Sequence, residues 1–144
     1  MAVVGFNFNN INVEKKEAGK GKISISNNVA IKNIEQKDFS LGKQSQSALK
    51  FTFEFTSKYD PKIGNILLGG DILYLGDAKK NKEVLDEWKK SKKVSPEIMA
   101  SVLNTVLAKC NIQALILSQE VNLPPPIPMP KVQVGEKQNK EYIG

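Results

Sequence analysis

The segment SPEIMASVLNTVLAKCNIQALILSQEVNLPPPIPMP, residues 95–130, joins a long amphipathic pattern to a run rich in proline. Ser95 suits an N-cap, Pro96 suits the first helical position, and Glu97 places negative charge where the helix dipole favours it. Apolar residues then recur at helical spacing, which predicts a helix over 96–119 with one broad buried face. These residues are Ile98, Met99, Val102, Leu103, Val106, Leu107, Cys110, Ala114, Leu115 and Leu117.

The length of this helix and the prolines behind it both suggest a surface for a partner. At about 1.5 Å per residue the helix would be roughly 36 Å long, more than a small domain needs to cover its own sheet. We therefore expect part of it to cover a partner. The prolines between Leu123 and Pro130 fix φ and remove backbone donors, which favours an extended arm. This arm has two interpretations, a groove wall or a packed part of the core.

The segments before this helix carry the alternation of apolar and polar residues that is typical of strands. Val4 to Val13 predicts a first strand with a kink or bulge around Asn9-Asn10. Ile23 to Ile34 predicts either one bent strand or a tight hairpin. Lys37 to Gln46 is polar, and we expect it to be a loop.

The clearest strand pattern lies between Leu49 and Thr56, where leucine and phenylalanine alternate with lysine, threonine and glutamate. This alternation predicts one buried face and one solvated face. A turn signal follows at Tyr59 to Gly64, and Ile66 to Leu75 predicts a fourth strand. Gly69-Gly70 lies inside that strand. We interpret the pair as marking a bulge, because the glycine spacing of a nucleotide-binding loop is absent.

A second, shorter helix is predicted over 79–92. Asp77 suits its N-cap, and Val84, Leu85 and Trp88 share one face. Strands followed by helices predict an α+β domain: a four-stranded antiparallel sheet with the short helix and the long C-terminal helix on its one apolar face.

Length and composition fit one domain. The chain has 144 residues and 40% hydrophobic content, which suits a single core over residues 1–130. Residues 131–144 form a polar, lysine-rich tail that we expect to be disordered. The sequence has no uninterrupted run of about 18 apolar residues and no signal-peptide pattern, so we expect a soluble, cytoplasmic protein without membrane insertion.

The composition also excludes several kinds of active site. No histidine is present, which rules out Ser/His/Asp and Cys/His nucleophilic sites and histidine metal sites. The single cysteine, Cys110, cannot form an internal disulfide and is expected to be a small core residue. The acidic residues are scattered among lysines without the spacing of a catalytic carboxylate pair. We therefore expect no catalysis, no cofactor and no metal.

The chain carries a net positive charge that comes from lysine alone. All 21 basic residues are lysine and the net charge is +6, whereas bidentate recognition of phosphate or guanine relies on arginine. Non-specific attraction to RNA stays open. The densest cluster is Lys89, Lys90, Lys92 and Lys93. The simpler interpretation of this cluster is a solvated helix end. The more specific interpretation is a contact with RNA or the ribosome.

Five segments follow one another in a recognisable order: Phe51 to Thr56, Tyr59 to Gly64, Ile66 to Tyr74, Ser95 to Leu107, and Ala114 to Ile127. In order and local shape they resemble the SecB-type chaperone family, which acts in protein transport. The resemblance covers most of residues 3–130. It implies an antiparallel four-stranded sheet, helices on one face, homo-oligomers, and binding of unfolded polypeptide in long apolar grooves. This chain differs from bacterial members in being basic and in its charged helix over 77–94.

We expect polypeptide binding by apolar side chains that exceed the needs of one small core. These are Met99, Leu103, Leu107, Leu123, Pro125, Ile127 and Met129. Core packing is the simpler interpretation of each helix residue taken singly, whereas for Ile127 and Met129 groove and core are equally open. The partners would be unfolded or partner polypeptide and a second copy of the chain. The alternatives are a ribosome- or RNA-associated basic factor, and a structural oligomer or toxin–antitoxin-linked chaperone subunit.

Overall fold

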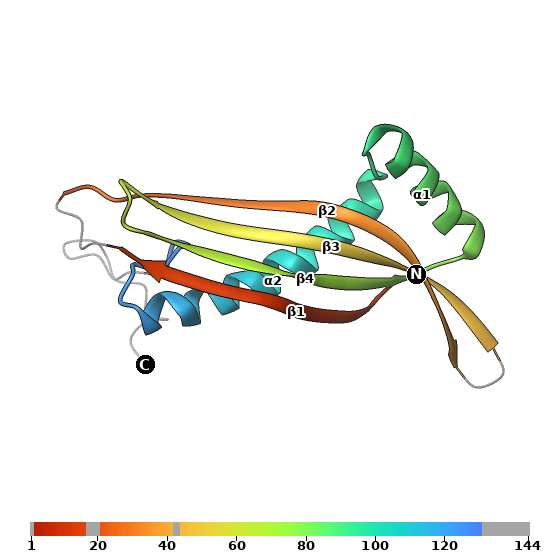
Figure 1. Cartoon of the computed structure of the whole chain (residues 1–144), viewed down its shortest axis with the longest axis horizontal. Coiled ribbons are helices and arrows are strands. Elements are labelled where there is room, and N and C mark those ends of the chain that lie inside the picture. Colours follow the sequence, from red (N-terminus) through yellow and green to blue (C-terminus); the bar gives the residue numbers. More distant parts are fainter. Residues whose placement is uncertain (1, 17–20, 42–43, 131–144) are drawn as a thin grey trace, which may run out of the picture.

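The computed structural model describes residues 2–16, 21–41 and 44–130, so the predicted tail over 131–144 lies outside the described residues. The elements are β1 (Ala2–Lys15), β2 (Ser24–Leu41), β3 (Gln44–Asp60), β4 (Gly64–Leu75), α1 (Ala78–Ser91) and α2 (Pro96–Glu120). The strands form one antiparallel sheet in the order β1-β4-β3-β2, with the helices on one face of it (Figure 1). The predicted α+β architecture is confirmed.

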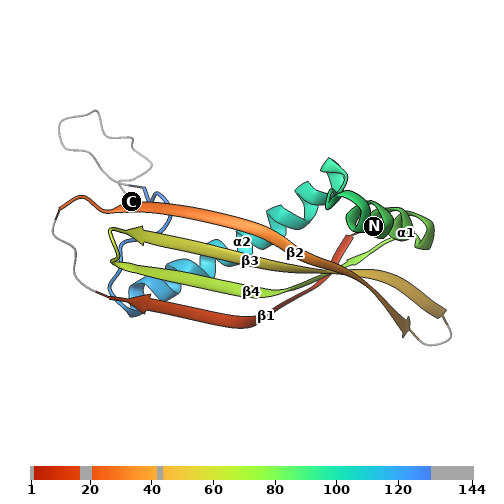
Figure 2. The same ribbon diagram turned by 45° about the horizontal axis from the view of Figure 1, so that its top comes forward.

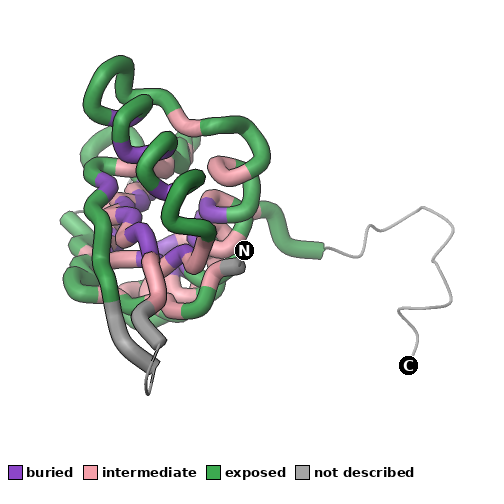
Figure 3. Tube along the Cα trace, turned by 90° about the vertical axis from the view of Figure 1, so that its right-hand side faces the viewer, coloured by how far each residue is buried: buried purple, intermediate pink, exposed green. Residues whose placement is uncertain are grey.

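The core lies between the helices and the face of the sheet that we call the inner face. Phe51, Phe53 and Phe55 of β3 point inward and are fully buried, while Thr52 and Glu54 point to the outer face and are partly exposed. β4 shows the same alternation along its whole length. Figure 3 views the chain end-on and shows the buried positions gathered where sheet and helices meet. The solvated second face predicted for β3 is thus present.

β2 is one continuous strand, and the polar loop predicted over Lys37 to Gln46 is wrong. β2 pairs with β3 from Ser24 to Leu41, with one register shift between Ile31 and Asn33. The ladder extends through residues 37–41 and 44–48 because backbone groups pair whatever side chains they carry. Figure 1 shows the far end of this two-stranded ribbon projecting beyond the rest of the sheet.

Gly69 and Gly70 do not form a bulge in β4. The extra residue belongs to β1, whose register shifts between Phe8 and Asn10 opposite the glycine pair. Gly70 itself is required by space, because a Cβ there would overlap the carbonyl oxygen of Asn7 and lie 2.9 Å from the Phe53 ring. The prediction of a bulge was right for β1 and wrong for β4, where close backbone approach explains the glycine.

α1 begins and packs as predicted. The Asp77 carboxylate accepts a hydrogen bond from the backbone N–H of Lys79 at 3.1 Å, and Val84, Leu85 and Trp88 are buried. Asn81 is buried as well, and its side-chain amide donates to the Ser47 hydroxyl at 3.0 Å. This bond ties α1 to the start of β3.

α2 starts at the predicted place, but Ser95 caps it without a side-chain hydrogen bond. Pro96 occupies the first turn, where no backbone donor is needed. On the inner side Val102, Val106 and Cys110 are fully buried. Burial raises the pKa of the Cys110 thiol to about 12, which keeps it protonated at neutral pH and fits the predicted core role.

α2 crosses the face of the sheet obliquely. Its first turns lie beyond β2 beside α1, and its last turns reach the β1 edge (Figures 1 and 2). At about 3.3 Å per residue even the shortest strand, the 12-residue β4, is roughly as long as the helix. By length and composition alone α2 is long and apolar enough to cross a membrane, although it contains no uninterrupted run of about 18 apolar residues. The core helix of a soluble protein can have the same length and composition.

Candidate functional site

β2 is an edge strand whose inner face is incompletely covered. Ile25, Val29 and Ile31 stand opposite Tyr59, Phe55 and Phe53 of β3, so they share the inner face of the sheet, yet all three remain half-buried. α2 packs on β1, β3 and β4 and diverges from β2 along its course (Figure 1). Two hollows remain beside β2, one at each end of this uncovered region.

The first hollow, the arm groove, lies between Ile25 of β2 and the proline arm, which we define as residues 123–130. Its volume is about 470 Å³ and its lining is Ile25 with Pro124, Pro125, Pro126, Ile127, Pro128 and Met129. Every one of these residues is apolar. The groove can therefore hold apolar side chains but supplies no charge.

Side chains of the sheet hold the arm in place. The Tyr59 hydroxyl donates to the Pro124 carbonyl oxygen at 2.6 Å, and the Asn27 amide donates to the Pro126 carbonyl oxygen at 2.8 Å. Ser57 in turn donates to the Asn27 side-chain oxygen at 2.6 Å. Because proline has no backbone N–H, the arm offers mainly acceptors, and β2 and β3 supply the matching donors.

Burial raises the pKa of one of these donors, the Tyr59 phenol. Tyr59 is 1% exposed, and this burial raises the pKa of its phenol to about 12. The phenol therefore stays protonated at neutral pH and keeps its hydrogen for Pro124. The Tyr59 hydroxyl can therefore donate its hydrogen bond to the arm at any pH below the strongly alkaline range.

The arm is both core and groove wall. Leu123 and Pro126 are buried, so they anchor the arm, and Leu123 does not line the groove. Ile127 is half-buried, and Met129 is 49% exposed. The predicted residues thus divide between the two interpretations, with Leu123 in the core and Pro125, Ile127 and Met129 along the groove.

The second hollow, the Trp88 groove, lies where α1, α2 and β2 meet. Its volume is about 510 Å³ and its lining is Val29, Ala30, Ile31, Lys32, Trp88, Lys92, Met99 and Leu103. Met99 and Leu103, both predicted, are half-buried one helical turn apart. Leu107 lies one turn further on, packs partly buried against the core, and lines neither groove.

The predicted lysine cluster is divided by the structure. Lys92 lines the Trp88 groove, with its Nζ atom 5.0 Å from the centre of the indole ring. Lys89, Lys90 and Lys93 are exposed and line neither the Trp88 groove nor the arm groove. Within the described ranges no group of three or more acidic or cysteine side chains is placed to hold a metal ion.

A third hollow of about 410 Å³ lies on another side of α1, between α1 and the start of α2. Glu83, Glu87 and Glu97 line it together with Lys80. It was not predicted, and its lining carries mainly negative charge, in contrast to the Trp88 groove.

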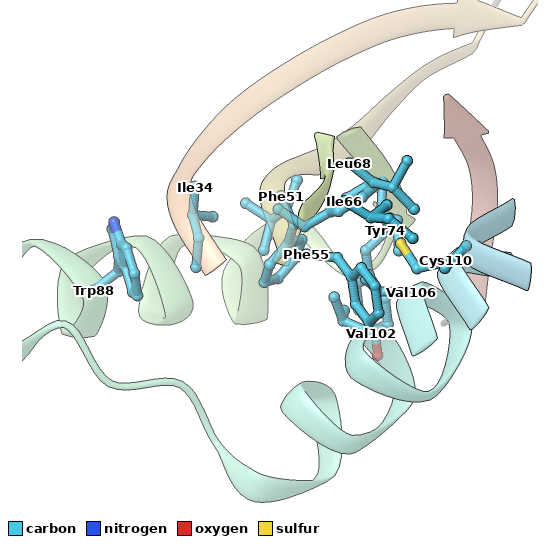
Figure 4. Packing of buried hydrophobic residues seen from close by; sticks show 14 of the residues in the cluster. Ile34, Phe51, Phe55, Ile66, Leu68, Tyr74, Trp88, Val102, Val106 and Cys110 are labelled. Atoms are coloured by element: carbon cyan, nitrogen blue, oxygen red, sulfur yellow. The ribbon is translucent and has the colours of Figure 1, made fainter. Parts of the chain in front are cut away.

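Sequence reasoning missed the contribution of β2 and of Trp88 to the grooves. Val29 and Ile31 carried a strand signal, and Trp88 a helix-face signal, but both signals are those of ordinary core residues. Figure 4 shows Trp88 on α1 at the end of the buried cluster where Ile34 of β2 lies. Only the edge position of β2 and the oblique course of α2 turn these residues into groove walls.

No protein-family model matches the chain, and no curated protein matches it by sequence. Among solved structures the chain is similar to the SecB-like chaperone Rv1957 of Mycobacterium tuberculosis, in complex with a ChAD peptide from the antitoxin HigA1. The match has a TM-score of 0.51 and 8% identity, and it covers 90% of this chain and 88% of that chain. The chain therefore has a SecB-like fold.

Proposed function

We propose that this protein binds unfolded or partner polypeptide in the arm groove and the Trp88 groove, as a non-catalytic, chaperone-like module. The observation that carries the proposal is the pair of largely apolar hollows beside one partly covered edge strand. The SecB-like fold supports it at a coarse level, because the mycobacterial neighbour with this fold holds a peptide.

The spacing of the grooves suits an extended segment. Ile25 of the arm groove and Val29 of the Trp88 groove are four positions apart on β2, which corresponds to about 13 Å along a strand. A client of about six to eight extended residues could therefore place apolar side chains in both. Each buried client side chain would contribute on the order of 1.5–3 kcal/mol before the cost of ordering the client.

We also propose that the protein acts as a homo-oligomer. Ile112 and Ile116 lie one turn apart on the outer side of α2 and are 61% and 47% exposed. Exposed isoleucines one turn apart on a helix are typical of a contact surface rather than of a solvated helix face. A second copy of the chain is the partner expected from the predicted helix-mediated assembly.

The binding of a labelled apolar peptide, measured by fluorescence anisotropy over a salt series, tests the proposed function. Apolar capture should hardly weaken between about 50 mM and 500 mM salt, because salt does not screen hydrophobic contacts. Binding of RNA through several lysines would weaken steeply over the same range. Recovery of RNA alone, and only at low salt, would overturn the proposal and favour the basic-factor alternative.

A further inference from the structure

The indole N–H of Trp88 is a buried donor without an acceptor among the described residues. Trp88 is 7% exposed, and its Nε1 atom is buried without a hydrogen-bond partner among the described residues. Buried donors of this kind are rare in folded proteins because each forfeits the hydrogen bond it made to water. Trp88 lines the second groove, so the residue that carries this donor forms part of a wall of a candidate binding site.

Lys92 places a cation beside the same ring. Lys92 is the C-cap of α1 and has a left-handed backbone conformation, with φ of 57°. Its backbone N–H donates a hydrogen bond to the Trp88 carbonyl oxygen at 3.0 Å. The Lys92 ammonium lies 5.0 Å from the indole centroid. Lys92 is exposed and lies over the face of the ring, so its ammonium is free to pair with a client carboxylate. The Nε1 atom at the ring edge is buried in the free protein, so a client reaches it only when the side chains around Trp88 move.

The charged residues that line the Trp88 groove are both cationic. Lys32 and Lys92 are the charged members of the lining, and no carboxylate is among them. The nearest ion pair in the structure joins Lys32 to Glu54 at 4.0 Å, and both side chains of that pair are largely exposed. Glu83, Glu87 and Glu97 line the separate hollow on the other side of α1. The groove therefore complements negative charge.

We propose that the Trp88 groove selects client segments in which an acidic side chain lies next to large apolar ones. The client carboxylate accepts hydrogen bonds from the Trp88 Nε1–H and the Lys92 ammonium. Its apolar neighbours pack on Val29, Met99 and Leu103. This inference rests on the proposed function, and it adds a chemical preference that the arm groove cannot supply, because no charged side chain lines it.

Two apolar ten-residue peptides test the preference. They have the same sequence except at one central position, which is Glu in one peptide and Gln in the other. The wild-type chain should bind the Glu peptide about tenfold more tightly, the size expected of a charge-assisted hydrogen bond. Lys92→Met, which keeps the aliphatic stem, should remove most of this Glu-over-Gln difference, whatever it does to the affinity for the Gln peptide itself. Lys90→Met is the matched control, because Lys90 lies on the same helix end but does not line the groove.

Trp88 is the single tryptophan of the chain, so its fluorescence reports on this groove directly. The Glu peptide should shift the emission and the Gln peptide should shift it less. Trp88→Phe, which keeps the aromatic packing and removes the donor, should lower the Glu preference once circular dichroism has shown the variant to be folded. A Trp88→Phe variant that fails to fold leaves the decision to Lys92→Met and the wild-type emission.

The outcomes separate the two proposals. If both peptides bind with equal affinity, or if Lys90→Met lowers the Glu preference as much as Lys92→Met, the selectivity is overturned and the polypeptide-binding function stands. If neither peptide binds, the proposed function and the selectivity are both overturned.

Discussion

The hydroxyl of Tyr59 donates a 2.6 Å hydrogen bond to the carbonyl oxygen of Pro124, which lies 65 positions further along the chain. This bond joins the third strand to the proline arm and sets the position of one groove wall. Leu123, Pro124 and Pro126 approach β4, β3 and β2 in turn, so the arm crosses the strands. The position of the arm groove therefore depends on a bond from the sheet to one of the prolines that line it.

Replacing Tyr59 by Phe should loosen the arm. The change leaves the Pro124 carbonyl without its donor, which should cost about 1–3 kcal/mol of unfolding free energy, measured by urea titration. Limited proteolysis should cut the arm faster in this variant. Tyr74→Phe is the matched control, since Tyr74 is also a buried tyrosine but lines the hollow beside α1. Equal effects of the two changes would show that the Tyr59 hydroxyl contributes no more to stability than that of Tyr74, which contradicts a special role for the bond to Pro124.

Alkaline pH should weaken the fold through the same residue. The folded pKa of Tyr59 is raised from 10.0 to about 12, so above pH 10 the unfolded chain releases a proton that the folded chain retains. Stability present below pH 10 is therefore lost as pH rises toward 12, on the order of 2–3 kcal/mol for this group.

Urea titrations at about pH 8 and pH 11 measure this loss. Tyr59→Phe should reduce the alkaline slope without removing it, because the Cys110 thiol has a pKa raised from 9.0 to about 12 by burial. The double variant with Cys110→Ala should flatten the slope further. An unchanged slope in Tyr59→Phe would mean that the phenol is not protected as its burial indicates.

Ile127→Ser combined with Met129→Ser should weaken polypeptide binding without unfolding the domain. Both side chains line the arm groove, and Met129 is 49% exposed, so their loss removes contact area for a client rather than core packing. We expect a loss of about 1–3 kcal/mol of binding free energy per site with little change in melting temperature. Leu123→Ala is the contrasting variant, because Leu123 is buried and its truncation should cost about 2–5 kcal/mol of stability. A large fall in melting temperature for the double variant would assign the arm to the core.

Gly70→Ala should destabilise the sheet, whereas Gly69→Ala should be nearly neutral. A Cβ at Gly70 would overlap the Asn7 carbonyl oxygen and press on the Phe53 ring, so β1 must move away from β4. A Cβ at Gly69 meets its nearest neighbour at an ordinary 3.6 Å. We expect a cost of about 1–3 kcal/mol for the first change, measured by urea unfolding. Similar stabilities for the two variants would contradict the close approach.

Ile112→Asp with Ile116→Asp should lower the oligomer mass and leave the monomer folded. Both side chains are exposed on α2, so charge there costs the chain little but opposes contact between apolar surfaces. Sedimentation at micromolar concentration should show at least a dimer for the wild-type chain and a smaller species for the variant. Val106→Asp is the contrast, because Val106 is fully buried and its replacement should unfold the domain. A monomeric wild-type chain would overturn the oligomer proposal.

Local patterns in the sequence determined most of the elements. The alternation in β3, the Asp77 cap of α1 and the Pro96 start of α2 all involve neighbouring residues, so period and capping chemistry suffice to predict them. The same reasoning failed at residues 37–46, because backbone groups pair in a ladder whether or not a side chain is buried. It also assigned the bulge to the glycine pair, although the extra residue lies on the facing strand.

The sequence by itself determined which residues are apolar, where the helices begin, and that the arm has few backbone donors, because these follow from side-chain chemistry and proline geometry. Only the tertiary structure decided that β2 lies at an edge, that α2 leaves it uncovered, and that Trp88 faces a groove. Burial of Ile31 and exposure of Ile112 depend on strand order and helix course. Strand order and helix course are set by contacts between segments that are distant in the sequence. The spacing of apolar residues in a single segment does not reveal them, because it is the same whether that face meets core, solvent or a client.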